Sequence, residues 1–167
     1  MEKSLEQRVQ ELEDRERIRE LRATYCFLVD DGRFDELVNR CFTENARCDF
    51  RATDGSFKPF VSNGRQGIRA FYFNGVGGLL RDMCHTVHNH RIVLNGDEAS
   101  GDCYFELTAT DNLTGNDVIG TGRYIDRYRR EEGEWRFAER RADLFFMAPH
   151  GEGWSKNRFI PGFGREA

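Results

Sequence analysis

The sequence predicts a single α+β domain, with helices in its first half and an antiparallel sheet in its second half. Apolar residues follow a helical spacing over the first 30 residues, and from Asp82 onward four strand-length segments are separated by turn sequences. The chain has 167 residues, which is the length of one domain that can bury a sizeable core. Helices followed by a run of strands imply that the helices pack on one face of the sheet.

The helical half begins with one long segment. Its apolar residues recur at intervals of three, four or six positions among charged residues: Leu5, Val9, Leu12, Ile18, Leu21, Tyr25 and Leu28. Asp30-Asp31-Gly32 ends this helix. A second, short helix is predicted from Phe34 to Cys41, a strand around residues 46–50, and a third helix after the Asn63-Gly64 turn.

Four strands are predicted in the second half, at residues 83–94, 99–110, 118–129 and 134–147. The segments between them are rich in turn-forming residues, so three consecutive hairpins should build an antiparallel meander. We expect residues 1–148 to form the domain. Residues 149–167 are rich in Gly and aromatic residues, including Trp154, Phe159 and Phe163, and should form a tail that covers a pocket or a subunit interface.

Composition and charge argue against several classes of protein. The net charge is −4 and no basic patch stands out, so nucleic acid is not an expected partner. The five cysteines form no CxxC pair, which is typical of reduced thiols. The charged N-terminus does not resemble a signal peptide and no apolar run is long enough to span a membrane, so we expect a cytoplasmic protein. The 14 Phe should line a core, a ligand cavity or a subunit interface.

Three histidines lie close together near the start of the first long strand. Strand alternation places His85 and Asn89 on one face and His88 and His90 on the other, so a three-histidine metal site is not expected without a bulge. On spacing alone, His85 is consistent with an ordinary hydrogen-bonded strand histidine. Asp30 ends an apolar stretch and, if buried, would need a partner. A neutral histidine would serve, and such a pair has the chemistry of a general base.

Three stretches, taken together, resemble a known family. They are residues 18–30, which hold Tyr25 and Asp30, then residues 85–89 and residues 128–137. In order and spacing they resemble the SnoaL-like branch of the nuclear transport factor 2 superfamily over about residues 8–148. The similar members are bile acid 7α-dehydratase, scytalone dehydratase and hexachlorocyclohexane dehydrochlorinase. The resemblance implies a cone-shaped fold, in which a curved mixed sheet wraps around helices and encloses an apolar cavity. It also implies a homotrimer that needs no cofactor.

The resemblance also implies roles for individual residues. Asp30 and His85 match the catalytic Asp–His pair of those lyases, Tyr25 matches a tyrosine near the substrate, and Arg140 matches an arginine that lines the pocket. Leu107 stands where the bile acid enzyme has an aspartate, and Phe50 where it has a tyrosine. The expected substrate-binding residues are Phe50, Asn89, Phe105, Leu107, Leu144 and Phe146.

These residues predict a cofactor-independent lyase that acts on a hydrophobic ring compound. His85 would remove a proton, and Asp30 would orient the His85 ring. Because Leu107 replaces an aspartate and Phe50 replaces a tyrosine, the site favours a better leaving group than hydroxide. Elimination, retro-aldol cleavage, decarboxylation and isomerisation all fit. Two alternatives stay open, because a fold does not define a function. One is a non-catalytic protein that binds a hydrophobic ligand or a partner chain, and the other is the small structural subunit of a ring-hydroxylating dioxygenase.

Overall fold

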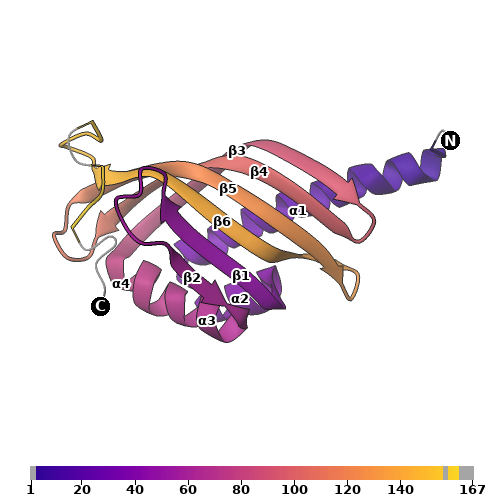
Figure 1. Cartoon of the computed structure of the whole chain (residues 1–167), viewed down its shortest axis with the longest axis horizontal. Helices are drawn as coiled ribbons and strands as arrows, with labels where there is room; N and C mark the ends of the chain where they lie inside the picture. Colours follow the sequence, from indigo (N-terminus) through magenta and orange to yellow (C-terminus); the bar gives the residue numbers. More distant parts are fainter. Residues whose placement is uncertain (1–2, 156–157, 162–167) are drawn as a thin grey trace.

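The computed structural model of the chain describes residues 3–155 and 158–161. The first elements are α1 (Leu5–Asp30), α2 (Phe34–Cys41), β1 (Phe42–Ala52) and β2 (Phe60–Asn63). A helical segment follows, made of α3 (Gly64–Ala70), the π-helix η1 (Phe71–Val76) and α4 (Gly77–Leu79). Four long strands complete the fold: β3 (Leu80–Asn95), β4 (Glu98–Asp111), β5 (Asp117–Glu131) and β6 (Glu134–Pro149). The predicted α+β class and the meander are confirmed, and the sequence missed only β2 among the strands (Figure 1).

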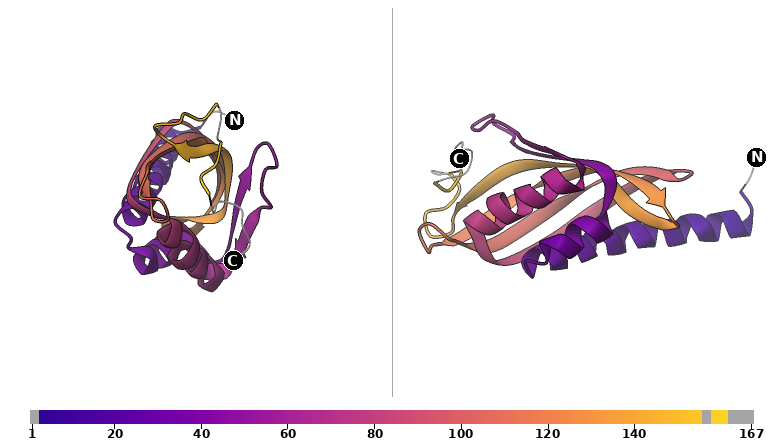
Figure 2. Two further views of the ribbon diagram at one scale, coloured as in Figure 1. Left: turned by 90° about the vertical axis from the view of Figure 1, so that its left-hand side faces the viewer. Right: turned by 90° about the horizontal axis from the view of Figure 1, so that it is seen from below.

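The six described strands form one mixed sheet in the order β2-β1-β6-β5-β4-β3. β1 runs parallel to β6, and all the other neighbouring pairs are antiparallel. The sheet curls strongly without closing, and the helices lie along its open side (Figure 2). Apolar side chains on the concave face therefore meet apolar side chains from the helices, and the core fills the inside of the curl.

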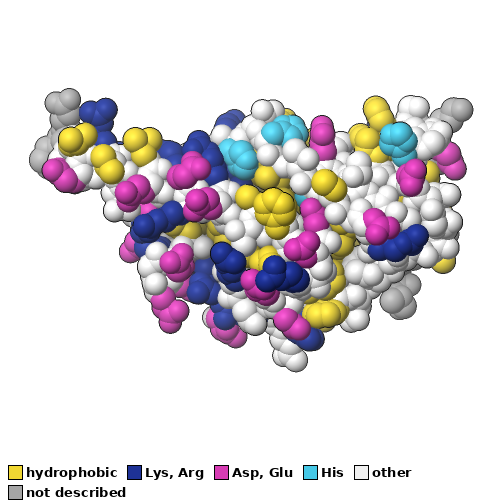
Figure 3. All heavy atoms as spheres, turned by 180° about the vertical axis from the view of Figure 1, so that it is seen from behind, with side chains coloured by type: hydrophobic (Ala, Val, Ile, Leu, Met, Phe, Trp, Pro, Cys, Tyr) yellow, Lys and Arg dark blue, Asp and Glu magenta, His cyan; other side chains and the backbone are white. Residues whose placement is uncertain are grey.

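Helix α1 begins with a capping box, in which the Ser4 hydroxyl accepts from the Gln7 backbone N–H and the Gln7 side chain accepts from the Ser4 N–H. Its second half packs on the sheet through the buried Ile18 and Leu21. Its first half projects beyond the sheet (Figure 1). The apolar side chains of this projecting end, Leu5, Val9 and Leu12, are exposed to solvent among acidic and basic side chains (Figure 3). The helical spacing of these three residues therefore does not identify core positions.

The segment from α3 to α4 lies along the open side of the curled sheet (Figure 2). Its middle turns have π-helical hydrogen bonding, a rare geometry that is frequent at functional sites. Gly77 lets this segment pack tightly, because a Cβ atom there would lie 2.8 Å from the Phe34 ring. The glycine thus fixes how closely the segment approaches α2.

Strand β3 contains a bulge that changes which residues face the helices. Asn89 has a φ of 57°, and the pairing with β4 shifts register between His88 and Arg91. His90 consequently turns toward α1, on the same side as His85, and contacts Arg22. The prediction that His88 and His90 share a face was therefore wrong, because alternation holds only for an unbroken strand. Even so, the described residues contain no group of three or more side chains placed to hold a metal ion.

The described part of the C-terminal tail returns to the end of β6. Phe159 forms a parallel bridge with Met147, Ile160 is buried, and Trp154 stacks on Phe146 with 4.9 Å between ring centroids. Phe163 lies outside the described residues. None of the helices in the described part of the chain combines the length and apolar character that a membrane-spanning helix needs.

Candidate active site

A cavity of about 450 Å³ lies inside the curl, between the concave face of the sheet and the α3–α4 segment. Most of its wall is hydrophobic, which suits an apolar ligand of small-molecule size. Four residue types supply its polar side-chain atoms: His, Tyr, Asn and the thioether of Met. The lining residues are Tyr25, Val29, Phe50, Phe60, Phe71, Tyr72, Asn74, Gly75, Val76, Leu79, Leu80, Met83, His85, Phe105, Leu107, Tyr124, Leu144 and Met147.

His85 and Asp30 meet at the wall of this cavity. One Asp30 oxygen lies 2.5 Å from Nδ1 of His85, and the other accepts a 2.8 Å hydrogen bond from the His85 backbone N–H. Both side chains are largely buried, at 7% and 15% exposure. A carboxylate at Nδ1 favours the tautomer that carries its proton there, which leaves Nε2 as the basic nitrogen. The two contacts together fix the imidazole ring against the end of α1.

Three tyrosines from three elements form a second polar group in the cavity wall. The hydroxyls of Tyr25 and Tyr72 lie 2.6 Å apart, and the ring of Tyr124 packs edge-on against Tyr25 with 5.9 Å between ring centroids. Burial raises the pKa of Tyr25 to about 12, and burial also raises the pKa values of Tyr72 and Tyr124 well above the usual range. All three phenols are therefore neutral hydrogen-bond donors at physiological pH.

Arg140 was expected to line the pocket, and its position differs from that expectation. The fully buried guanidinium lies behind the cavity wall, 3.9 Å from the Tyr25 ring centroid and 4.1 Å from that of Tyr124. Two hydrogen bonds of 3.0 Å hold it to Asp126. Burial acts to lower the pKa of Arg140, but the Asp126 carboxylate together with Tyr25 and Tyr124 outweighs burial, so the pKa is raised well above its usual range. The cation is thus separated from the cavity by aromatic rings.

The other expected binding residues divide into two sets. The first set lines the cavity: Phe50, Phe105, Leu107 and Leu144. The second set, Asn89 and Phe146, does not. The β3 bulge leaves Asn89 exposed, and a register shift opposite Thr121 moves Phe146 off the cavity so that Met147 faces it instead. Each misplacement follows from a bulge that an alternation argument cannot anticipate.

Sequence reasoning missed Tyr72 and Tyr124 as residues of the cavity. Tyr72 lies in the π-helix, which periodicity does not distinguish from an ordinary helix. Tyr124 stacks on Phe105 of the neighbouring strand at 4.4 Å, and its inward position two residues after Gly122 could have been read from strand alternation. A tyrosine at an inward position in a Phe-rich sheet is the signal that points to it.

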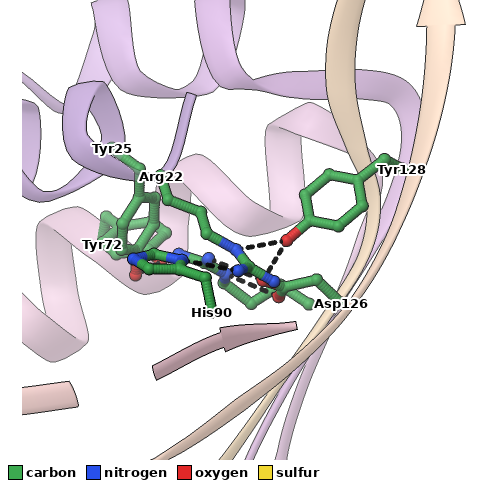
Figure 4. A network of polar contacts seen from close by, with 7 residues as sticks. Arg22, Tyr25, Tyr72, His90, Asp126 and Tyr128 are labelled. Atoms are coloured by element: carbon green, nitrogen blue, oxygen red, sulfur yellow. Dashed lines mark hydrogen bonds and ion pairs between the residues drawn. The ribbon is translucent and has the colours of Figure 1, made fainter. Parts of the chain in front are cut away.

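Deeper in the core, a polar network ties α1 to the sheet. Nε of Arg22 donates to the Tyr128 hydroxyl at 2.6 Å, and that hydroxyl donates to Asp126 at 2.7 Å. Nη1 of Arg22 lies 2.7 Å from Nδ1 of His90. Figure 4 shows the guanidinium of Arg22 between these partners, with Tyr25 and Tyr72 beside it. Arg140 binds the same Asp126, so this network links Arg140, which packs against the Tyr25 and Tyr124 rings, to Arg22 of α1.

Comparison with known families places this geometry in context. The family described as the SnoaL-like domain matches residues 10–141. The chain belongs to this SnoaL-like family. The family predicted from the sequence is thereby confirmed, and so is the curved α+β fold that it implies. No curated protein matches the chain in a sequence search.

Solved structures share the SnoaL-like fold over most of the chain. A candidate scytalone dehydratase from Novosphingobium aromaticivorans is 20% identical, with a TM-score of 0.73, over 84% of this chain and 89% of that one. A hexachlorocyclohexane dehydrochlorinase from Novosphingobium barchaimii is 18% identical, with a TM-score of 0.73, over 92% and 98%. The beta subunit of a candidate aromatic-ring-hydroxylating dioxygenase from Novosphingobium aromaticivorans is 18% identical, with a TM-score of 0.65, over 78% and 88%. At these identities the likeness concerns the fold alone.

Proposed function

We propose that this SnoaL-like protein is a cofactor-independent lyase that acts on a hydrophobic ring compound. In this proposal Nε2 of His85 is the general base, and Asp30 orients the ring and stabilises the imidazolium that forms. The single observation that carries the proposal is the double contact of Asp30 with His85 at the wall of an apolar cavity. A protein that only binds a ligand gains nothing from a paired, oriented base.

The cavity favours some bond-breaking reactions over others. Leu107 lies directly opposite His85 on β4, so no carboxylic acid is available there to protonate a leaving group. Phe50 likewise offers no hydroxyl. Elimination of a group that leaves as a stable anion, retro-aldol cleavage or decarboxylation needs only a base and a group that stabilises negative charge. Isomerisation by the same proton transfer is compatible with this site, and dehydration would have to return the His85 proton to the departing hydroxide.

The test compares variants of the two paired residues on a common substrate. Hydroxylated and halogenated ring compounds are screened without added cofactor for loss of water, halide, an aldehyde or carbon dioxide. His85→Ala and Asp30→Asn should each lower turnover by about 10²–10⁴-fold, the range for a lost general base. His88→Ala is the matched control, because His88 is on the outer side of the same strand, stacked on Tyr104. Unchanged turnover in both site variants would sink the proposal.

A non-catalytic role is the second candidate, since one solved structure with this fold is a dioxygenase beta subunit. In that case the cavity would bind a ligand or be filled on assembly, and removing His85 would leave binding and assembly intact. The homotrimer implied by the family resemblance is part of the lyase proposal. Sedimentation equilibrium of the purified chain gives its mass and tests this part separately.

A further inference from the structure

The projecting end of α1 carries an apolar stripe, made of Leu5, Val9 and Leu12. These side chains are 70%, 45% and 66% exposed and lie among charged side chains (Figure 3). Their spacing of four and three residues places them on one face of the helix. We propose that this stripe pairs with the same stripe of a second copy of the chain, as a short parallel two-stranded coiled coil. The contact lies outside the cavity and is independent of the lyase function proposed for it.

The stripe faces away from the core of its own domain. With 3.6 residues per turn, its centre lies about 170° around the helix axis from the buried Ile18, Leu21 and Tyr25 of the same helix. A surface helix ordinarily carries its apolar side chains on the face toward the core and polar ones on the opposite face. Apolar side chains on the opposite face, in the part of α1 that projects beyond the sheet (Figure 1), indicate a partner outside the domain.

The order of the residues in the stripe is that of a parallel two-stranded coiled coil. The steps of four and then three residues put Leu5 and Leu12 at d positions of a heptad and Val9 at the a position between them. Valine at a with leucine at d favours two strands over three or four. The next a and d positions hold Glu16 and Arg19, which bond to each other within the helix at 3.1 Å. The apolar contact is therefore confined to the projecting end.

The charges beside the stripe favour the parallel direction. Arg8 is at a g position and Glu13 at the following e position, and both side chains are exposed. In a parallel pair, the g side chain of one helix faces the e side chain five residues further along the other helix. Arg8 of each copy would therefore face Glu13 of the other, so the ion pair forms twice. In an antiparallel pair g faces g and e faces e, which would bring arginine against arginine and glutamate against glutamate.

The helix that carries the stripe is already formed, which lowers the cost of pairing. An isolated helix of fewer than about 12–15 residues is marginally stable in water. Here the capping box at Ser4 satisfies the N-terminus, and the second half of α1 is held by the domain. Pairing therefore orders only side chains, and it removes three apolar side chains of each copy from water.

A second copy fits the stripe better than a membrane surface does. Amphipathic helices that bind anionic membranes are rich in Lys and Arg on their polar face. In residues 3–16 acidic side chains outnumber basic ones, so an anionic surface would repel this helix. The arginine and glutamate at the g and e positions complement a second copy of themselves instead.

Disulfide trapping in the full chain tests the parallel arrangement. Leu5→Cys is made together with Cys84→Ser, which removes the exposed native thiol. At a d position of a parallel pair the two thiols are close enough to form a disulfide, so mild oxidation should give a covalent dimer. Gln10→Cys in the same background is the matched control, because it lies on another face of the helix and should remain monomeric on a denaturing gel. Equal cross-linking of the two variants, or a disulfide that forms only between Leu5→Cys and Leu12→Cys chains, overturns the proposal.

Sedimentation velocity over a range of protein concentrations measures the strength of the contact. Leu12→Gln should weaken the association step by about 100-fold, because a buried leucine is lost from both helices. Arg8→Glu should weaken it by about 10-fold, and adding Glu13→Arg to that variant should restore it, because the ion pairs re-form with their charges exchanged. Arg17→Glu, which changes the net charge equally on another face of the helix, is the control.

The same measurement separates this contact from any other assembly of the chain. Only the association step that Leu12→Gln removes is counted, so a homotrimer formed through another surface remains in that variant. At a concentration low enough to dissociate the wild type, all variants should unfold at the same temperature, which shows that the domain is intact. Equal association of the wild type and Leu12→Gln, or no recovery when Glu13→Arg is added to Arg8→Glu, overturns the proposal.

Discussion

The guanidinium of Arg22 donates a 2.7 Å hydrogen bond to Nδ1 of His90, across the interface between α1 and β3. Only an unprotonated nitrogen can accept this bond, so His90 carries its proton on Nε2 and is neutral. Burial lowers the pKa of His90, and the charge of Arg22 lowers it further. The pair therefore stabilises the contact between helix and sheet only while His90 remains neutral.

We predict that this contact makes stability depend on pH. A histidine whose pKa is lowered by folding binds its proton more readily in the unfolded chain, so its contribution is present above about pH 6.5 and is lost as the pH falls below that value. Urea unfolding of the wild type and His90→Gln between about pH 8 and about pH 5 measures the effect, because glutamine accepts the Arg22 bond without titrating. The wild type should lose more stability on acidification than His90→Gln. Parallel curves would contradict the prediction, and His88→Gln should behave like the wild type.

A second prediction concerns the buried ion pair of Arg140 and Asp126. Nε of Arg22 lies 3.5 Å from the same Asp126, so Arg140→Met removes one of the two buried cations at Asp126 together with both Arg140 hydrogen bonds. It should lower the free energy of unfolding by about 3 kcal/mol, the low end of the range for a broken buried pair. Arg127→Met is the matched control, because Arg127 is 78% exposed and 3.6 Å from Glu139 on the surface. An exposed pair contributes at most about 1 kcal/mol. The measurement is urea unfolding of both variants at one pH. Similar losses of stability would show that the buried ion pair stabilises the fold no more than the exposed one does.

Long elements were predictable from the sequence because their periodicity extends over many residues. The α1 helix and the four strands from β3 to β6 appear where the spacing and the turn residues put them. Strand β2 was missed because four residues carry too little pattern. The side of the strand on which His90 and Phe146 lie could not be predicted, because each depends on a bulge. Asn89 adopts its positive φ at the β3 bulge, and asparagine is one of the few residues that tolerates it, yet its presence alone does not predict a bulge.

The site was less predictable than the fold. Asp30 and His85 are 55 positions apart, and only the family resemblance indicated that they meet. The roles of Tyr72 and Tyr124 depend on how a π-helix and a curled sheet converge, which no local pattern encodes. Arg140 shows the opposite failure, because the resemblance identified the residue and the structure places aromatic rings between it and the cavity.

A third prediction uses two adjacent glycines of α4 that differ in their surroundings. A Cβ atom at Gly77 would lie 2.8 Å from the Phe34 ring and 3.3 Å from the Tyr72 backbone oxygen, whereas one at Gly78 would meet no atom within 4 Å. Neither residue has a positive φ, so the comparison isolates packing from backbone strain. Gly77→Ala should cost about 1–3 kcal/mol, because the Phe34 ring or the π-helix must move, and Gly78→Ala should be neutral or slightly stabilising.

The displacement caused by Gly77→Ala should also be visible in the cavity, because Phe34 packs on Tyr72 with 5.9 Å between ring centroids. Any shift of Phe34 or of the α4 segment changes the part of the cavity wall that η1 forms. The affinity of the cavity for nitrobenzene, a small apolar ring compound, should therefore fall in Gly77→Ala and remain unchanged in Gly78→Ala. Thermal unfolding and nitrobenzene titration of the same two variants measure both effects. Equal stability and equal affinity in the two variants would mean that the α3–α4 segment adjusts freely. In that case the shape of the cavity would not depend on its close contact with α2.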